Sequence, residues 1–126
     1  MTGGTVSGNS CHNVGGAIYM SEVSKVLELT NVTFENNYAE TAGAVFYRTG
    51  DALITGCTFE DNSSNNNGGA FYGYYGSLII KDTNFINNST NNWGGGCLNW
   101  NSSPMEMSNC YFENNNATHG GGLMIC

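Results

Sequence analysis

Charged residues are scarce in this chain. They make up 10% of the 126 residues, against roughly a quarter in an ordinary globular domain. Only Lys25, Arg48 and Lys81 are cations, and the formal net charge is −7 at pH 7. Nucleic-acid binding needs Lys and Arg side chains to replace the counterions of the phosphates. The composition therefore excludes a nucleic-acid partner, and an anionic membrane surface would repel the chain.

Long apolar runs are also missing. No stretch approaches the ~20 apolar residues of a transmembrane helix, so we expect no direct insertion into a membrane. The first residues lack the basic and apolar segments of a signal peptide, and the repeat described below is still running at Cys126. We therefore interpret residues 1–126 as one segment of a longer repeat protein, with its export signal or anchor outside the segment.

The sequence contains no motif for a metal, a cofactor or a disulfide framework. The five cysteines are an odd number and have no CxxC or zinc-finger spacing. Cys57 and Cys110 occupy equivalent repeat positions with Thr83 between them, which places them ~10 Å apart and beyond disulfide reach. His12 and His119 lie in unrelated corners without a companion nucleophile. We expect free thiols, no metal and no cofactor.

A Phe-x-x-Asn motif recurs four times, and its Phe residues are separated by 25, 26 and 27 residues. The segment from Val6 to Asn9 is a degenerate earlier copy. With 40% hydrophobic residues the chain has too much apolar material for a disordered segment. The four copies contain the Phe residues Phe34, Phe59, Phe85 and Phe112 and the Asn residues Asn37, Asn62, Asn88 and Asn115.

A second motif, of small residues followed by an apolar pair, keeps step with the first. We place its second small residue at Gly16, Gly43, Gly69, Gly96 and Gly122. Two independent motifs that stay in phase over the whole chain indicate a structural repeat of 25–28 residues.

Alternating apolar residues precede each Phe by seven, five and two positions, which predicts short strands with one face inward. Turn-forming residues lie three positions before each Phe. Each unit is therefore expected to contain about three strands of three to five residues. The apolar positions are Leu27, Leu29 and Val32, then Ala52, Ile54 and Cys57, then Leu78, Ile80 and Thr83, then Met105, Met107 and Cys110; the turn residues are Asn31, Gly56, Asp82 and Asn109.

Stacking of such units predicts an all-β, right-handed, single-stranded parallel β-helix of about five coils. Parallel pairing at ~4.8 Å places equivalent residues of successive coils above one another. The Phe residues then form an aromatic ladder and the Asn residues an amide ladder at a corner. Right-handedness follows from the general rule for parallel crossovers. The ends are expected to be uncapped, which allows edge-to-edge self-association.

The strand after the small-residue motif has two possible inward faces. One face contains aliphatic and aromatic residues, and the other combines alanines with aromatic residues. We expect the first face to point inward and keep the second as the alternative. The first face is Ile18, Val45, Phe71, Leu98 and Met124, and the second is Ala17, Ala44 and Ala70 with Tyr19, Phe46 and Tyr72.

The paired FxxN and GGA[ILV] motifs resemble the repeats of the chlamydial-type polymorphic membrane protein family. The small-residue motifs at Gly15–Ile18 and Gly68–Phe71 carry the resemblance best, whereas Cys97 and Leu123 stand where the family has Ala. The resemblance implies a secreted or outer-membrane right-handed β-helix, displayed at the cell surface as an autotransporter passenger. It also implies that the FxxN and GGA[ILV] residues themselves take part in adhesion to host cells.

A purely structural interpretation of the FxxN residues is stronger, because Phe would fill the core and Asn would close the corner. Adhesion to a cell-surface protein or glycan would then use exposed aromatic and amide side chains. The same aromatic residues could instead pack beneath their own corners. The candidate surface residues are Tyr72, Tyr74, Tyr75, Trp93 and Trp100, with residues 65–67.

A carbohydrate-active enzyme, either a polysaccharide lyase or a glycoside hydrolase, is the competing class. Glu35 and Glu60 occupy equivalent positions on adjacent coils, with Asp61 beside them, and a retaining hydrolase needs two carboxylates ~5 Å apart. Ile86 interrupts this row before Glu113 resumes it. No repeated basic group accompanies the row. We therefore favour a non-catalytic segment whose acidic row is a solvated edge.

Overall fold

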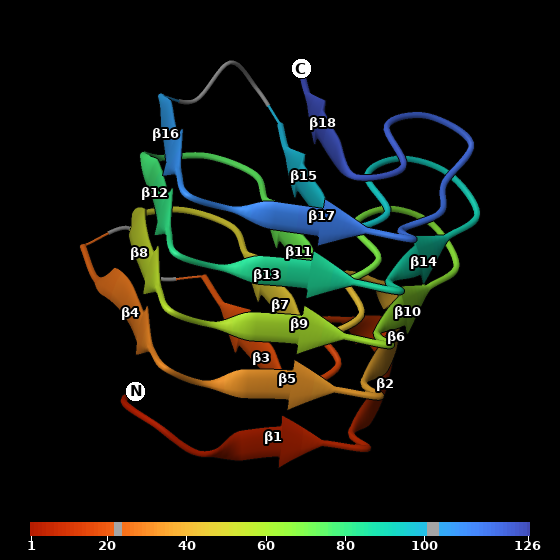
Figure 1. The fold of residues 1–126 in the computed structure, drawn as a ribbon, viewed down its shortest axis with the longest axis horizontal. Coiled ribbons are helices and arrows are strands. Elements are labelled where there is room, and N and C mark those ends of the chain that lie inside the picture. The colour runs from red at the N-terminus through yellow and green to blue at the C-terminus, as the bar shows by residue number, and fades with distance from the viewer. Residues whose placement is uncertain (22–23, 101–103) are drawn as a thin grey trace.

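The chain folds into a stack of coils in which every named strand pairs in parallel with the equivalent strand of the next coil. The computed structural model describes residues 1–21, 24–100 and 104–126, and these residues form eighteen strands in four parallel sheets (Figure 1). Each turn passes through the four sheets in the same order. Within the described residues no helix is both long enough and apolar enough to cross a membrane.

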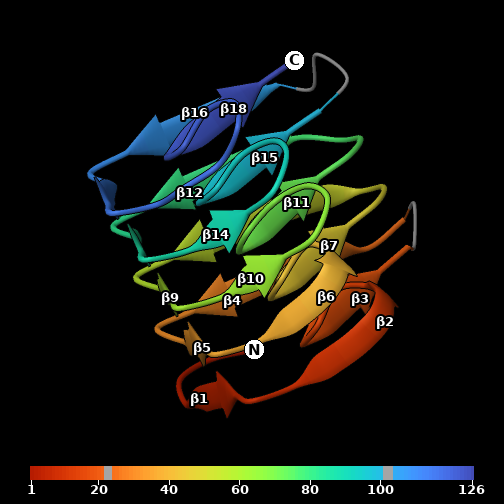
Figure 2. The ribbon, with the colours of Figure 1, turned by 90° about the vertical axis from the view of Figure 1, so that its right-hand side faces the viewer.

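The four sheets are named here by number. The first contains β4 (Val26–Thr30), β8 (Asp51–Thr55), β12 (Leu78–Lys81) and β16 (Met105–Ser108). The second contains β1 (Thr5–Ser7), β5 (Thr33–Glu35), β9 (Thr58–Glu60), β13 (Asn84–Ile86) and β17 (Tyr111–Glu113). The third contains β2 (Ser10–Val14), β6 (Tyr38–Thr41), β10 (Ser63–Ser64) and β14 (Ser89–Thr90), shown in Figure 2. The fourth contains β3 (Ile18–Met20), β7 (Val45–Tyr47), β11 (Phe71–Gly73), β15 (Cys97–Asn99) and β18 (Leu123–Ile125).

Each coil therefore has four strands rather than the three expected, and the chain completes four turns and begins a fifth. The additional strand is the short one of the third sheet, which has only two residues in β10 and in β14. Its sequence shows no alternating apolar pattern. Hydroxyl groups hold it instead, because Ser64 Oγ donates to Thr90 Oγ1 at 2.9 Å. A strand of this kind is invisible to hydrophobic periodicity.

The four Phe residues form one continuous stack inside the coils, as predicted. Phe34 pairs with Phe59, Phe59 with Phe85, and Phe85 with Phe112 in strand register. Their ring centroids are 5.0, 4.9 and 4.8 Å apart, and the rings are within 8° of parallel. The spacing equals the distance between neighbouring strands, so the sheet itself sets the geometry of the stack.

The four Asn residues form the predicted amide ladder at the corner after the Phe strand. Asn62 illustrates the pattern: its backbone N and its Nδ2 both donate to Asn88 Oδ1 at 3.0 Å, and its Nδ2 also donates to Phe34 O. In turn, Asn62 Oδ1 accepts from the backbone N and the Nδ2 of Asn37. Each amide thus satisfies a backbone N–H and a backbone carbonyl of the preceding coil and bonds the amide of the next coil, which explains why the position is Asn in all four copies.

The two corners on either side of the Phe strand require left-handed backbone. The predicted turn residues Asn31, Gly56, Asp82 and Asn109 have φ values between 50° and 64°. The third residue of each FxxN motif also has positive φ, between 53° and 55°, at Asn36, Asp61, Asn87 and Asn114. Asn, Asp and Gly adopt this conformation at the lowest cost. The preference of the FxxN motif for Asn or Asp at its third position therefore has a conformational cause.

The structure corrects the register of the last two small-residue motifs. Gly94 has φ +68°, matching Gly68 at +66°, so Gly94 and Gly95 form the glycine pair and Gly96 takes the alanine position. The same shift applies at Gly120–Gly122. The column of second small residues is therefore Gly16, Gly43, Gly69, Gly95 and Gly121, and the placement of Gly96 and Gly122 in it is wrong. Three consecutive glycines carry no local signal of which two form the pair.

The inward face of the fourth sheet changes accordingly. The paired residues Ile18, Val45, Phe71, Cys97 and Leu123 point inward, and Val45, Phe71 and Cys97 are fully buried in the main core. The prediction is correct for the first three and wrong for Leu98 and Met124, which lie one residue further on. Those two join the outward row that begins at Tyr19.

Candidate functional site

The FxxN residues lie in the interior of the solenoid and are not available to a partner. Phe34, Phe59 and Phe85 have no exposed surface, and neither do Asn37, Asn62 and Asn88. Phe112 and Asn115 in the outermost coil are partly buried. Gly16, Gly43 and Gly69 pack against the backbone of the neighbouring coil, where an added Cβ would lie about 2 Å from a carbonyl oxygen. The geometry gives all these residues a structural role.

The outward row of the fourth sheet contains a second apolar cluster, separate from the main core. The row consists of Tyr19, Phe46, Tyr72, Leu98 and Met124, in strand register along the solenoid axis. Tyr19 and Phe46 stack with ring centroids 5.6 Å apart, and Phe46 meets Tyr72 edge-on at 5.1 Å. This face of the sheet is thus covered by aromatic rings rather than by the polar residues typical of a solvated face.

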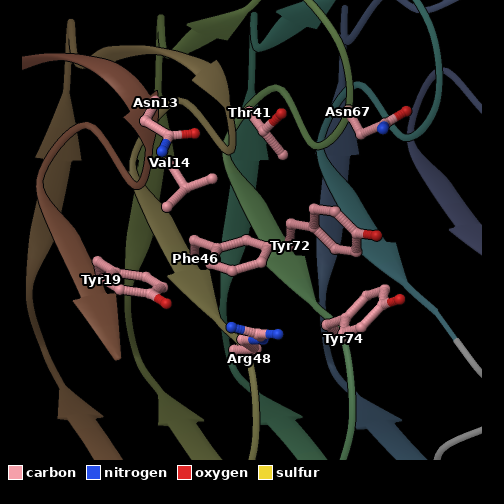
Figure 3. A pocket seen from close by; sticks show the side chains of 9 residues that line it. All are labelled: Asn13, Val14, Tyr19, Thr41, Phe46, Arg48, Asn67, Tyr72 and Tyr74. Carbon is pink, nitrogen blue, oxygen red and sulfur yellow. The ribbon is translucent and has the colours of Figure 1, made fainter. Parts of the chain in front are cut away.

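A groove runs over this row across the first three coils. Its volume is about 420 Å³. Tyr19, Phe46 and Tyr72 form the floor (Figure 3). One rim consists of Asn13, Val14, Thr41 and Asn67, and the other of Arg48 and Tyr74. We call this feature the aromatic groove.

Two tryptophans cover the same row in the fourth coil. Trp93 and Trp100 lie just before and just after β15, and their rings stack with centroids 4.7 Å apart at an angle of 12°. Both pack against the cluster that contains Leu98, which has no exposed surface. In the first coil, by contrast, Tyr19 is 48% exposed. The aromatic groove is therefore open at Tyr19, whereas the row is covered at the tryptophan pair.

The aromatic groove combines neutral polar groups with one positive charge. Arg48 is exposed and is the one charged residue among the described residues that line it. The one ion pair among the described residues is Lys81–Glu106 on the first sheet, at 3.4 Å, so Arg48 has no carboxylate partner within them. Burial, with the nearby Tyr74 adding to it, raises the pKa of Tyr72 to about 12. The Tyr72 phenol therefore stays neutral at physiological pH.

Four of the five predicted surface aromatics gather at the outward row of the fourth sheet. Tyr72 and Tyr74 line the aromatic groove, but Tyr72 is only 7% exposed, so its ring packs against its neighbours more than it faces solvent. Trp93 and Trp100 are partly buried and form the cover beside the groove. Tyr75 lies outside, exposed, with its ring edge-on to Tyr74 at 4.7 Å. Within residues 65–67, Asn67 lines the groove, whereas Asn65 Nδ2 donates to Glu40 Oε1.

Sequence reasoning did not assign Tyr19, Phe46, Thr41 or Arg48 to a binding site. For Tyr19, Phe46 and Tyr72 the alternation of residues along the strand was a usable signal, since they belong to the alternative face of that strand. Thr41 and Arg48 carry no such signal. They reach the groove because they flank β7 on its two sides.

The carboxylate row lies on another sheet. Glu35 and Glu60 are register neighbours on β5 and β9, and this sheet lies across the interior from the fourth, as the edge-on contact of Phe59 with Phe71 at 6.1 Å shows. No carboxylate of the described part of the chain lines the aromatic groove. Among the described residues no group of three or more His, Cys, Asp and Glu side chains is arranged to hold a metal. All five cysteines are free, and burial raises the pKa of Cys97.

Two family models match the chain. The model described as "Right handed beta helix region" matches residues 16–126, and that described as "Chlamydia polymorphic membrane protein (Chlamydia_PMP) repeat" matches residues 3–21. The comparison with curated proteins and the comparison with solved structures each returned no match. The first match agrees with the four stacked parallel sheets and confirms the predicted right-handed sense. The second confirms the resemblance of the repeats.

Proposed function

Since the chain belongs to the right-handed β-helix family, we propose that it is a non-catalytic, surface-displayed solenoid segment. In this proposal its aromatic groove binds a protein or glycan of a host cell or a neighbouring cell. The match of residues 3–21 to a polymorphic membrane protein repeat supports a place at the outer membrane or cell surface. The rest of the coil serves as a rigid stalk that holds the groove.

The outward aromatic row is the observation that carries this proposal. The interior columns already account for the stacking of the coils, because the Phe and Asn ladders satisfy both packing and hydrogen bonding. The rings of Tyr19, Phe46 and Tyr72 lie outside that core and form the floor of a groove of about 420 Å³. Grooves with an aromatic floor and a polar rim are typical of binding sites.

Cell binding with matched variants tests the proposal. Fluorescently labelled chain should bind cultured epithelial cells, and Tyr19→Ala should reduce the bound fluorescence several-fold because it removes the most exposed ring of the groove floor. Tyr111→Ala is the control, since Tyr111 is 53% exposed on the second sheet, away from the groove. Equal loss with both variants, or no binding by the parent chain, would contradict the proposal.

The adjacent carboxylates Glu35 and Glu60 favour one second candidate, a glycoside hydrolase or polysaccharide lyase. Both side chains are only half-buried, and neighbouring strands place the residues ~4.8 Å apart. Against it, none of the described residues that line the aromatic groove carries a carboxylate. Release of reducing ends or of unsaturated products from a panel of polysaccharides, abolished by Glu60→Gln, would establish the enzyme and overturn the adhesin.

A further inference from the structure

We infer that the aromatic groove is specific for a saccharide that carries a carboxylate. A sugar ring would lie against the aromatic floor, and the carboxylate would pair with Arg48. This inference rests on the proposed function, because it names the class of ligand for the same groove. Three observations carry it: the aromatic floor, a guanidinium without an ion-pair partner among the described residues, and the cover at one end.

The floor favours a sugar over a peptide. Of the three strands beneath it, β7 pairs with β3 and β11, and β11 pairs with β7 and β15, so both have their two edges occupied, whereas β3 is the edge strand of the sheet. Over Phe46 and Tyr72 an extended peptide would therefore find no unpaired backbone for strand addition. Aromatic rings, however, accept the apolar C–H face of a sugar ring, and the rim side chains Asn13, Thr41 and Asn67 offer hydrogen-bond donors and acceptors for its hydroxyl groups.

Arg48 favours an acidic sugar over a neutral one. In a chain of net charge −7, this exposed guanidinium has no ion-pair partner among the described residues. Its side chain lies between the rings of Tyr19 and Tyr74 in the view of the groove (Figure 3). A guanidinium binds a carboxylate through two parallel hydrogen bonds, which gives both affinity and orientation.

The size of the groove and its covered end favour binding of the end of a glycan over binding along a long chain. Tyr19, Phe46 and Tyr72 lie on three successive coils, so the floor spans ~10 Å, which accommodates one or two sugar rings. The Trp93–Trp100 pair covers the outward row beyond Tyr72. A long polyanionic chain would also be repelled by the net charge of the protein. We therefore expect recognition of a terminal acidic sugar.

Calorimetric titration of the 126-residue chain with 3′-sialyllactose and with lactose tests this inference directly. The two probes differ by the carboxylate-bearing sugar, so we expect the acidic probe to bind about tenfold more tightly or better. Tri-galacturonate serves as a second acidic probe. Binding of the preferred acidic probe should weaken as salt is raised, because the contact with Arg48 is an exposed ion pair.

Matched variants identify the residues involved. Arg48→Gln should lose about tenfold in affinity for the acidic probe and leave lactose binding unchanged, with Arg48→Lys intermediate. Lys81→Gln is the charge-matched control, because Lys81 pairs with Glu106 on the first sheet. Far-UV circular dichroism should show the parent fold in every variant, since Arg48 and Lys81 have largely exposed side chains. Failure of both acidic probes to bind, or equal binding by Arg48→Gln, overturns the inference.

Cell binding separates failure of this inference from failure of the proposed function. One result would be equal binding of the chain to cells before and after periodate oxidation of their glycans, with Arg48→Gln binding as well as the parent. That result would support the adhesin function and contradict the acidic saccharide as its ligand. If the chain binds 3′-sialyllactose but no cell type, the groove assignment stands and adhesion is wrong. Absence of both activities contradicts both proposals.

Discussion

The phenylalanine stack and the aromatic groove are both rows of aromatic rings along the solenoid axis, but they differ in regularity. The stack has Phe in four successive coils, with centroids 4.8–5.0 Å apart and nearly parallel rings. The outward row contains Tyr, Phe, Tyr, Leu and Met in turn, and its rings meet at 22° and 78°. The first row fills the interior of the coils, whereas the second lies on the outward face of the fourth sheet and is open to solvent chiefly at Tyr19, which is 48% exposed.

This difference separates the part of the repeat that builds the fold from the part that is available for function. An identical residue in each coil repeats one favourable contact at every interface, so a solenoid gains stability from such columns. A row whose residues change from coil to coil gains less from stacking, but it creates a site with a floor, two different rims and one covered end. We therefore expect the stack to respond to mutation in stability and the groove in binding.

Phe59→Ala should have the largest effect on stability. It removes the central ring of the stack and leaves a cavity between Phe34 and Phe85, which costs ~4 kcal/mol of the free energy of unfolding. Tyr19→Ala, in the groove row, should cost less than ~1 kcal/mol because its ring is half exposed. Urea denaturation followed by circular dichroism measures both. Similar losses for the two variants would remove the distinction between the rows.

Asn62→Ala should cost ~3 kcal/mol, because it leaves the buried backbone N–H of Asn37 and the buried carbonyl of Phe34 without their partners. Asn66→Ala is the matched control: Asn66 is exposed, and its backbone hydrogen bond to Glu40 does not depend on its side chain. The difference in urea midpoint between the two variants measures the contribution of the amide ladder. A tolerated Asn62→Ala would mean that water replaces the amide at this corner.

Gly69→Ala and Gly122→Ala distinguish the two positions of the small-residue motif. An added Cβ at Gly69 would lie 2.0 Å from the carbonyl oxygen of Gly95, so the coils must separate, at a cost of ~2–3 kcal/mol. At Gly122 the nearest atom is Phe112 Cβ at 3.4 Å, an ordinary contact. Since Gly122 occupies the alanine position, Gly122→Ala should be neutral or stabilising by ~0.5 kcal/mol. Thermal melting of both variants checks the corrected register.

A smaller loss of stability is expected at alkaline pH, and it should involve one tyrosine of the core and one of the aromatic groove. Burial raises the pKa of Tyr47, in the core, and of Tyr72, in the groove, from 10.0 to about 12. The folded state therefore keeps two protons that the unfolded state loses above pH 10. The contribution of these two phenols to the free energy of unfolding is fully present below pH 10 and is lost between pH 10 and about 12. Absorbance titration at alkaline pH should show two late tyrosines, one fewer in Tyr47→Phe and in Tyr72→Phe.

Much of the fold could be predicted because, in a parallel solenoid, similar residues that recur at a nearly constant interval in the sequence stack on one another in successive coils. The Phe and Asn columns, the alternating residues before each Phe and the turn residues all followed from repeat positions, and the paired strands confirm them. The aromatic groove was only partly predictable. Tyr72, Tyr74, Trp93 and Trp100 stood out as aromatic residues near corners, but nothing in their spacing showed that the last two would stack on each other.

The sequence by itself determined the repeat, the strand class and the two interior ladders, since each depends on a periodic pattern that one coil shares with the next. Tertiary structure alone decided which glycines of each triple form the close-packed pair, because only contact with the adjacent coil distinguishes Gly95 from Gly96. It also decided where the surface site lies. Arg48 and Thr41 flank one strand, and Trp93 and Trp100 flank another. The bend of the coil around each strand places the first two on opposite rims of the aromatic groove and stacks the second two on each other.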